Sequence, residues 1–225
     1  MLGAYLIGIV FAIAGMIASG VLKSKFRKYS QIPVAGGLTG RDIAERMLRE
    51  NGIDDVQVIS VAGQLTDHYN PQNKTVNLSE GVYNSNSIAA AAVAAHECGH
   101  AVQHAKGYAW LELRSQLVPV VSIASQWVMW VILAGILLIN TFPSLLLIGI
   151  ILFGATTLFS FVTLPVEFDA SRRAIAWLGQ SSVAGTMEMS KAKDALRWAA
   201  STYVVAALGS LATLLYYIMI YTSRR

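Results

Sequence analysis

The sequence predicts a multi-pass α-helical membrane protein with about four transmembrane helices and a small α+β cytoplasmic domain. The 225-residue chain has 55% hydrophobic and only 13% charged residues, about half the charged fraction of an average soluble domain. Its mean hydropathy is +0.52. Asp, Glu, Lys and Arg are absent from residues 1–22, 115–166 and 198–223, as a bilayer requires. The single cysteine, Cys98, excludes a disulfide-built secreted scaffold.

The first predicted transmembrane helix covers residues 1–22. A spanning helix needs about 20 mainly apolar residues, and this stretch carries no charged side chain. A cleaved signal peptide carries positive charge before its apolar run. Here the cationic residues follow that run, at Lys23, Lys25, Arg27 and Lys28. We therefore expect an uncleaved anchor.

Residues 117–166 predict a hairpin of two further transmembrane helices. The apolar run is too long for one helix, and the polar, proline-bearing segment 140–144 interrupts it. We therefore expect the two spans near residues 118–139 and 145–164.

The final segment, residues 202–225, contains the fourth predicted span, near residues 203–221. Three tyrosines stand near one end of this apolar stretch, where aromatic side chains reach the membrane interface.

The distribution of Lys and Arg predicts the orientation in the cytoplasmic membrane. Of 17 such residues, ten lie in residues 23–116 and five in residues 167–201. Because cytoplasmic loops are enriched in Lys and Arg, we expect both segments on the cytoplasmic side. Arg224 and Arg225 then lie outside, as a small exception. These clusters explain the net charge of +4 and predict contact with anionic lipid of the bilayer, not with nucleic acid.

Residues 23–116 are long enough for one small domain, which begins with a helix and continues with strands. Thr39 is the predicted helix cap, and Gly52 follows the helix end. Val56, Val58 and Val61 predict one strand near residues 56–61. Val76 and Leu78, which would face the same side, predict another over residues 75–79. We consider the second strand either an edge strand that aligns an extended substrate or a plain structural strand.

The second helix of this domain is predicted to be alanine-rich and to run from Ile88 to about Ala105, with Ser87 as its cap. It carries the sequence His96-Glu97-Cys98-Gly99-His100, the HExxH pattern of zinc proteases.

The spacing of this pattern has a mechanical reason. Residues four apart project from one face of a helix, so His96 and His100 can bind one Zn²⁺ ion. Glu97 then reaches a water held by that metal and accepts its proton as a general base during attack on a peptide carbonyl. The alternative is a helix whose histidines face water.

A catalytic zinc ion normally has a third protein ligand. His104 lies eight residues beyond His96 on the same straight helix, which cannot fold it back onto the metal. The metzincin arrangement needs a glycine bend where Gln103 stands, so that subclass is rejected.

A carboxylate from another helix remains, and Glu167 is the best placed. It follows Pro165 at the cytoplasmic end of the third predicted span, and a proline is typical of the first turn of a helix. The alternative is an interfacial carboxylate paired with Arg172 or Arg173.

Several segments around these residues form a combined signature: residues 67–71 (DHYNP), 76–79 (VNLS), 82–83 (VY), 96–103 (HECGHAVQ) and 164–173 (LPVEFDASRR). This signature and the order of parts over nearly the whole chain resemble the YugP-type membrane zinc metallopeptidases of bacteria, within the gluzincin type. The resemblance implies a zincin-like cytoplasmic domain, zinc as cofactor, His96, His100 and Glu167 as its ligands, and Glu97 as the general base.

More distantly, the layout is similar to HtpX-type proteases and CAAX prenyl proteases. In those groups an aspartate four residues after the ligand glutamate often orients a ligand histidine. Ser171 stands at that position here, with Asp169 two residues after the glutamate, and either can take the orienting role. Candidate oxyanion donors are His68, Tyr83, His104 and Arg172.

The leading hypothesis is a membrane-embedded zinc metalloendopeptidase that hydrolyses peptide bonds near the cytoplasmic membrane face. Its expected substrates are proteins or peptides, above all membrane proteins. One alternative is a site-2-type intramembrane protease, in which the HExxH helix itself spans the bilayer. The other is a non-catalytic membrane scaffold that contains zinc. No motif specifies an oligomeric state.

Overall fold

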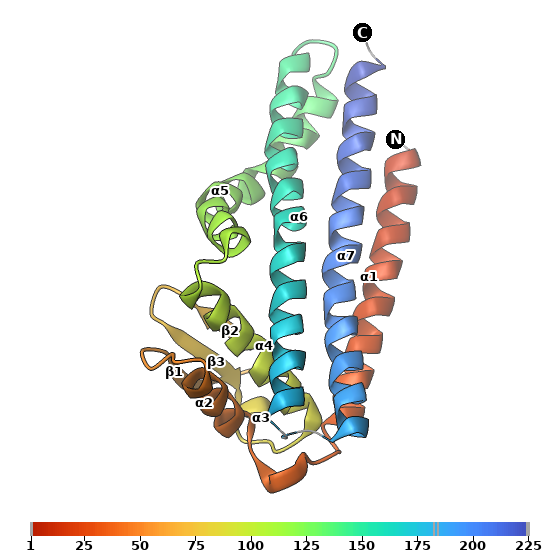
Figure 1. The fold of residues 1–225 in the computed structure, drawn as a ribbon. Helices are drawn as coiled ribbons and strands as arrows, with labels where there is room; N and C mark the ends of the chain where they lie inside the picture. The colour runs from red at the N-terminus through yellow and green to blue at the C-terminus, as the bar shows by residue number, and fades with distance from the viewer. Residues whose placement is uncertain (1, 182, 184, 224–225) are drawn as a thin grey trace. The chain divides into compact units, whose positions relative to one another are not determined.

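The chain is mostly helical and contains one small three-stranded sheet (Figure 1). The computed structural model describes residues 2–181, 183 and 185–223. Met1 of the first predicted span and the terminal Arg224 and Arg225 lie outside the described residues. The chain divides into two compact units. A helical unit comprises Met1–Ala18, Glu112–Pro165 and Thr202–Arg225, and a mixed unit comprises Ser19–Leu111 and Val166–Ser201.

Four helices are long and apolar enough to cross a membrane, by length and composition, among the residues described. They are α1 (Leu2–Tyr29), α5 (Ala109–Leu137), α6 (Pro143–Gln180) and α7 (Thr186–Thr222). The four predicted spans fall on these helices.

Each of these helices extends beyond the predicted span. Helix α6 runs through Pro165, which stands in the helix interior and not in a first turn. A proline there offers no N–H to the carbonyl four residues earlier. Residues 167–201 comprise the end of α6, a short connection and the start of α7.

Within the helical unit, two glycines allow α5 and α6 to pack closely. A Cβ atom on Gly135 would lie 2.6 Å from the Cα atom of Leu146, and one on Gly149 would lie 2.7 Å from a side-chain carbon of Ile132. Ile132, Leu146 and Ile150 form the small core between these helices. The hairpin thus depends on backbones that approach closely, as is common between transmembrane helices.

The mixed unit contains the short elements. They are α2 (Gly40–Glu50), β1 (Gln57–Val61), β2 (His68–Asn70), β3 (Thr75–Ser79), α3 (Glu80–Tyr83) and α4 (Ile88–Ala105). The strand order is β1-β3-β2, with β3 parallel to β1 and antiparallel to β2. Of the two interpretations of residues 75–79, the edge strand is wrong, because β3 is the central strand, paired with β1 over its whole length and with β2 over residues 75–77.

Local signals in the sequence explain where α2 and α4 begin. The Thr39 hydroxyl accepts a hydrogen bond from the backbone of Asp42 at 3.2 Å, and the Asp42 carboxylate accepts one from the backbone of Thr39 at 2.9 Å. This capping box confirms the predicted start of α2. Ser87 accepts a bond from the backbone of Ala90 at 3.2 Å, which confirms it as the cap of α4.

The core of the mixed unit lies between α2, α4 and the sheet. Ile43 and Met47 of α2 and Val76 and Leu78 of β3 are at most 1% exposed and belong to one buried cluster with the alanines of α4. Small alanine side chains let neighbouring elements approach α4 closely. The helix that carries the HExxH pattern is thus held on several sides by protein.

Candidate metal centre

Three side chains from α4 and α6 converge inside the mixed unit. One ligand atom each of His96, His100 and Glu167 lies within 4.8 Å of the others, and Glu167 and His100 are buried. The Glu167 Oε2 atom is 3.2 Å from His96 Nε2 and 3.8 Å from His100 Nε2. Two imidazole nitrogens and one carboxylate oxygen are the donor set of many catalytic zinc sites.

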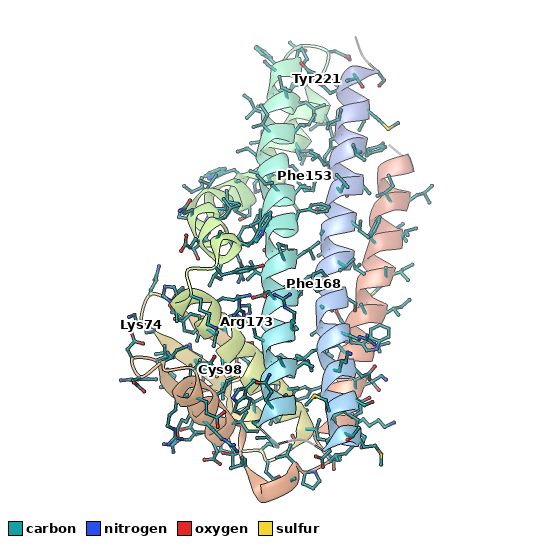
Figure 2. All side chains as sticks on the ribbon, viewed as in Figure 1. Lys74, Cys98, Phe153, Phe168, Arg173 and Tyr221 are labelled. Atoms are coloured by element: carbon teal, nitrogen blue, oxygen red, sulfur yellow. The ribbon has the colours of Figure 1, made fainter. Side chains whose placement is uncertain are left out.

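A close approach of α4 and α6 makes this convergence possible. A Cβ atom on Gly99 would lie 2.6 Å from the carbonyl oxygen of Ala170, so only glycine fits there. In Figure 2, the label Cys98 marks α4 next to Gly99, and the label Arg173 marks α6. The glycine of the motif therefore brings the helix with both histidines against the helix with the glutamate.

Each histidine makes a hydrogen bond through the ring nitrogen that points away from Glu167. His96 Nδ1 lies 3.1 Å from the Ser171 hydroxyl, and His100 Nδ1 lies 3.0 Å from the side-chain oxygen of Gln103. Such partners orient metal-binding histidines. Both Nε2 atoms are thereby directed toward Glu167, and the residues present fit a zinc ion.

Glu97 lies beside the convergent group and is 8% exposed. Burial raises the pKa of Glu97 to about 7; the nearby His96 opposes this rise, while Glu167 and Asp67 add to it. The backbone of Tyr69 in β2 also opposes this rise in the pKa of Glu97. Strand β2 thus lies against the part of α4 that carries the candidate base.

Arg172 and Arg173 both pair with the buried carboxylate of Asp169. The alternative in which these two arginines pair with Glu167 is therefore not what the structure shows. Asp169 also accepts a hydrogen bond of 3.0 Å from the amide nitrogen of Gln103. Of the two candidates for orienting a histidine, Ser171 contacts His96 directly and Asp169 reaches His100 only through Gln103.

Comparison with known proteins agrees with this geometry. A family model described as "Putative neutral zinc metallopeptidase" matches residues 4–222. The chain belongs to this family. It is also 45% identical over 204 residues to a protein of Bacillus subtilis (strain 168) named "Putative membrane protease YugP", and the match covers 91% of this chain and 90% of that protein. The resemblance predicted from the sequence is confirmed. No solved structure matches the chain.

Membership of the zinc metallopeptidase family implies a zinc ion, for which His96, His100 and Glu167 are the candidate ligands. Within the described residues, neither His68 nor His104 belongs to the convergent group. His104 Nδ1 lies 2.7 Å from the Tyr69 hydroxyl, and His68 Nδ1 lies 2.8 Å from the Thr66 carbonyl oxygen.

Tyr83 and Gln103 lie in the same mixed unit as the convergent group. Tyr83, a candidate oxyanion donor, lies with its ring centre 5.8 Å from the Arg41 guanidinium. Gln103 received no role from the sequence, although it is completely buried and contacts His100. The available signal was its position three residues after His100, on the same side of α4.

Proposed function

We propose that the protein is a membrane zinc metalloendopeptidase that hydrolyses peptide bonds near the cytoplasmic membrane face. The observation that carries the proposal is the convergence of ligand atoms from His96, His100 and Glu167 within 4.8 Å, directly beside Glu97. Two histidines and a carboxylate leave one position of a tetrahedral zinc site for water or substrate. The family description supports the same chemistry.

The roles of the protein groups follow from their positions. A zinc ion bound here would lower the pKa of a coordinated water toward neutrality and polarise a peptide carbonyl. Glu97 would accept a proton from the attacking water on a carboxylate oxygen and deliver it to the leaving amine. The burial of Glu97, at 8% exposed, limits competition from bulk water for that proton.

The proposed location rests on charge and on chain continuity. The segments with most of the Lys and Arg residues, 23–116 and 167–201, include nearly all of the mixed unit, which favours the cytoplasmic side. Helix α6, which supplies Glu167, is also one of the four candidate membrane spans. A site built partly on a spanning helix supports membrane proteins or their cytoplasmic tails as substrates.

The decisive experiment compares wild type with Glu97→Gln as detergent-purified full-length proteins. We expect about one zinc ion per chain in both, by elemental analysis, because the ligands are unchanged. Cleavage of a fluorogenic peptide library should fall by about 10²- to 10⁴-fold in the variant, the usual contribution of a general base. Glu80→Gln, at an exposed glutamate of α3, is the matched control and should retain full activity.

The outcomes also separate the alternative functions. Wild type that binds no zinc under metal-replete conditions would refute the peptidase proposal. Zinc in both proteins, with equal cellular behaviour of wild type and Glu97→Gln, would favour the zinc-containing scaffold. The site-2-type arrangement gains no support, because the four candidate spans of the described chain do not include α4.

A further inference from the structure

Gln103 is a fully buried polar side chain that connects α4 with α6. It is 0% exposed, and its amide group makes three contacts. The side-chain oxygen lies 3.0 Å from His100 Nδ1, and the nitrogen donates to the Val166 carbonyl at 2.8 Å and to Asp169 Oδ2 at 3.0 Å. A buried amide satisfied at both ends holds its neighbours in a defined arrangement.

The partners of the amide decide which end points where. A backbone carbonyl such as that of Val166 only accepts hydrogen bonds, so it must face the NH₂ end of Gln103. Asp169 is held as a second acceptor by Arg172 and Arg173, whose guanidinium groups are always protonated. A flipped amide would place its oxygen against two other acceptor oxygens, so the side-chain oxygen must face His100.

The direction of these hydrogen bonds determines which ring nitrogen of His100 carries the proton. An amide oxygen only accepts, so Nδ1 of His100 must carry a hydrogen, and the neutral imidazole then has its lone pair on Nε2. We infer that Gln103 is a positioning residue that fixes His100 in the Nδ1–H tautomer, so that its Nε2 atom can bind a metal ion without prior proton rearrangement. That Nε2 of His100 binds a metal ion rests on the proposed function, whereas the assignment of the tautomer does not.

His96 provides an internal contrast. Its Nδ1 atom faces the hydroxyl of Ser171 at 3.1 Å, and a hydroxyl can either donate or accept. Ser171 therefore does not by itself fix the tautomer of His96. The Glu167 carboxylate, 3.2 Å from His96 Nε2, only accepts and favours the hydrogen on Nε2 of His96, so the two histidines should differ in spectra of the metal-free protein.

The test is nitrogen NMR of the full-length protein in detergent, with ¹⁵N in its four histidines. Spectra are recorded at about pH 8, and His68→Gln and His104→Gln assign two of the signals. We expect His100 as the Nδ1–H tautomer both with and without zinc. In Gln103→Met, which removes the acceptor, this preference should be lost and zinc affinity, measured by chelator competition, should fall by about 10- to 100-fold.

Cys98→Ala is the matched control, because Cys98 is equally buried on the same helix and outside the hydrogen-bond chain. It should leave the tautomer and the zinc affinity unchanged. An Nε2–H tautomer of His100 in metal-free wild type would overturn the inference without any variant. So would an unchanged tautomer in folded Gln103→Met, even if zinc still binds. A protein that binds no zinc, yet shows the Gln103-dependent tautomer, would refute the proposed function alone.

Discussion

At the residue scale, two buried acids near the candidate metal centre, Asp169 and Glu167, contact different groups. Asp169 and Glu167 each have a side chain only 4% exposed. Asp169 is paired with two guanidinium groups, whereas the atoms nearest Glu167 include imidazole nitrogens of His96 and His100. An imidazole pair is a suitable partner for a buried carboxylate when a cation binds between them. The two acids should therefore respond differently to substitution.

We expect Glu167→Ala to lose most bound zinc, because it removes one of three ligands. Asp169→Asn should keep about one zinc ion per chain and bind it about 10- to 100-fold more weakly, since it removes no ligand and affects the site through Gln103 and His100. Elemental analysis and chelator competition on the two purified variants measure both effects. Equal zinc content in Glu167→Ala and wild type would remove Glu167 from the ligand set.

Cys98 gives a second residue-scale prediction. Its side chain is 0% exposed, and burial raises the pKa of its thiol. Because only the thiolate reacts with alkylating agents, native protein should resist maleimide and react stoichiometrically once unfolded in SDS. Mass spectrometry measures the labelling, and Gln72→Cys, at an exposed position, supplies a reactive control. Fast labelling of native Cys98 would contradict the packing of α4.

Sequence reasoning found the histidines and the glutamate but not the role of Gln103, and the difference is physical. The spacing of His96 and His100 is a property of one helix, and so it is visible in the sequence. The acceptors that orient Gln103 lie 63 and 66 residues away. Val166 and Asp169 become partners of Gln103 only when α6 packs on α4, and no local sequence pattern predicts that packing.

At the element scale, the same distinction separates confirmed predictions from corrected ones. Thr39 and Ser87 mark helix starts through contacts within three residues, and both were predicted. The central place of β3 depends on pairing with two separate segments. The sequence did not predict that place, because it leaves open whether residues 75–79 form an edge strand. The third span was predicted to end at residue 164, where hydropathy falls. Helix α6 continues because Val166, Ala170, Ala174 and Leu178, four apart, form a buried stripe.

The contact between α4 and α6 can be tested through its glycine. In Gly99→Ala the added Cβ atom would lie 2.6 Å from the Ala170 carbonyl oxygen, so the helices must separate. We expect a loss of about 1–3 kcal/mol in stability from overpacking and weaker zinc binding, because His96 and His100 move away from Glu167. Thermal unfolding and chelator competition in detergent measure these changes.

Gly81→Ala is the matched control, because nothing lies within 4 Å of a Cβ atom added at Gly81. It should leave zinc affinity at the wild-type level. If Gly99→Ala bound zinc as tightly as Gly81→Ala, the close approach of the two helices would not be what assembles the site.

At the scale of the whole molecule, outward-facing apolar side chains and the placement of charge both indicate a membrane protein. In the helical unit, Trp127, Met129 and Trp130 of α5 are 60%, 71% and 64% exposed. Large apolar groups in such numbers are not left in water by a soluble protein. The mixed unit instead holds most of the Lys and Arg residues, as a water-facing part does.

This asymmetry leads to a prediction about sidedness. The turn at residues 140–144 has no Lys or Arg, whereas residues 23–116 have ten, so the positive-inside rule places the turn outside and the mixed unit in the cytoplasm. Cys98→Ala removes the only native cysteine. In that background, Thr141→Cys and Gln72→Cys introduce single exposed thiols in the turn and in the mixed unit.

A membrane-impermeant maleimide should label Thr141→Cys in intact cells and Gln72→Cys only in inverted vesicles. The reverse pattern would place the candidate metal centre outside the cell and exclude cytoplasmic tails as its substrates.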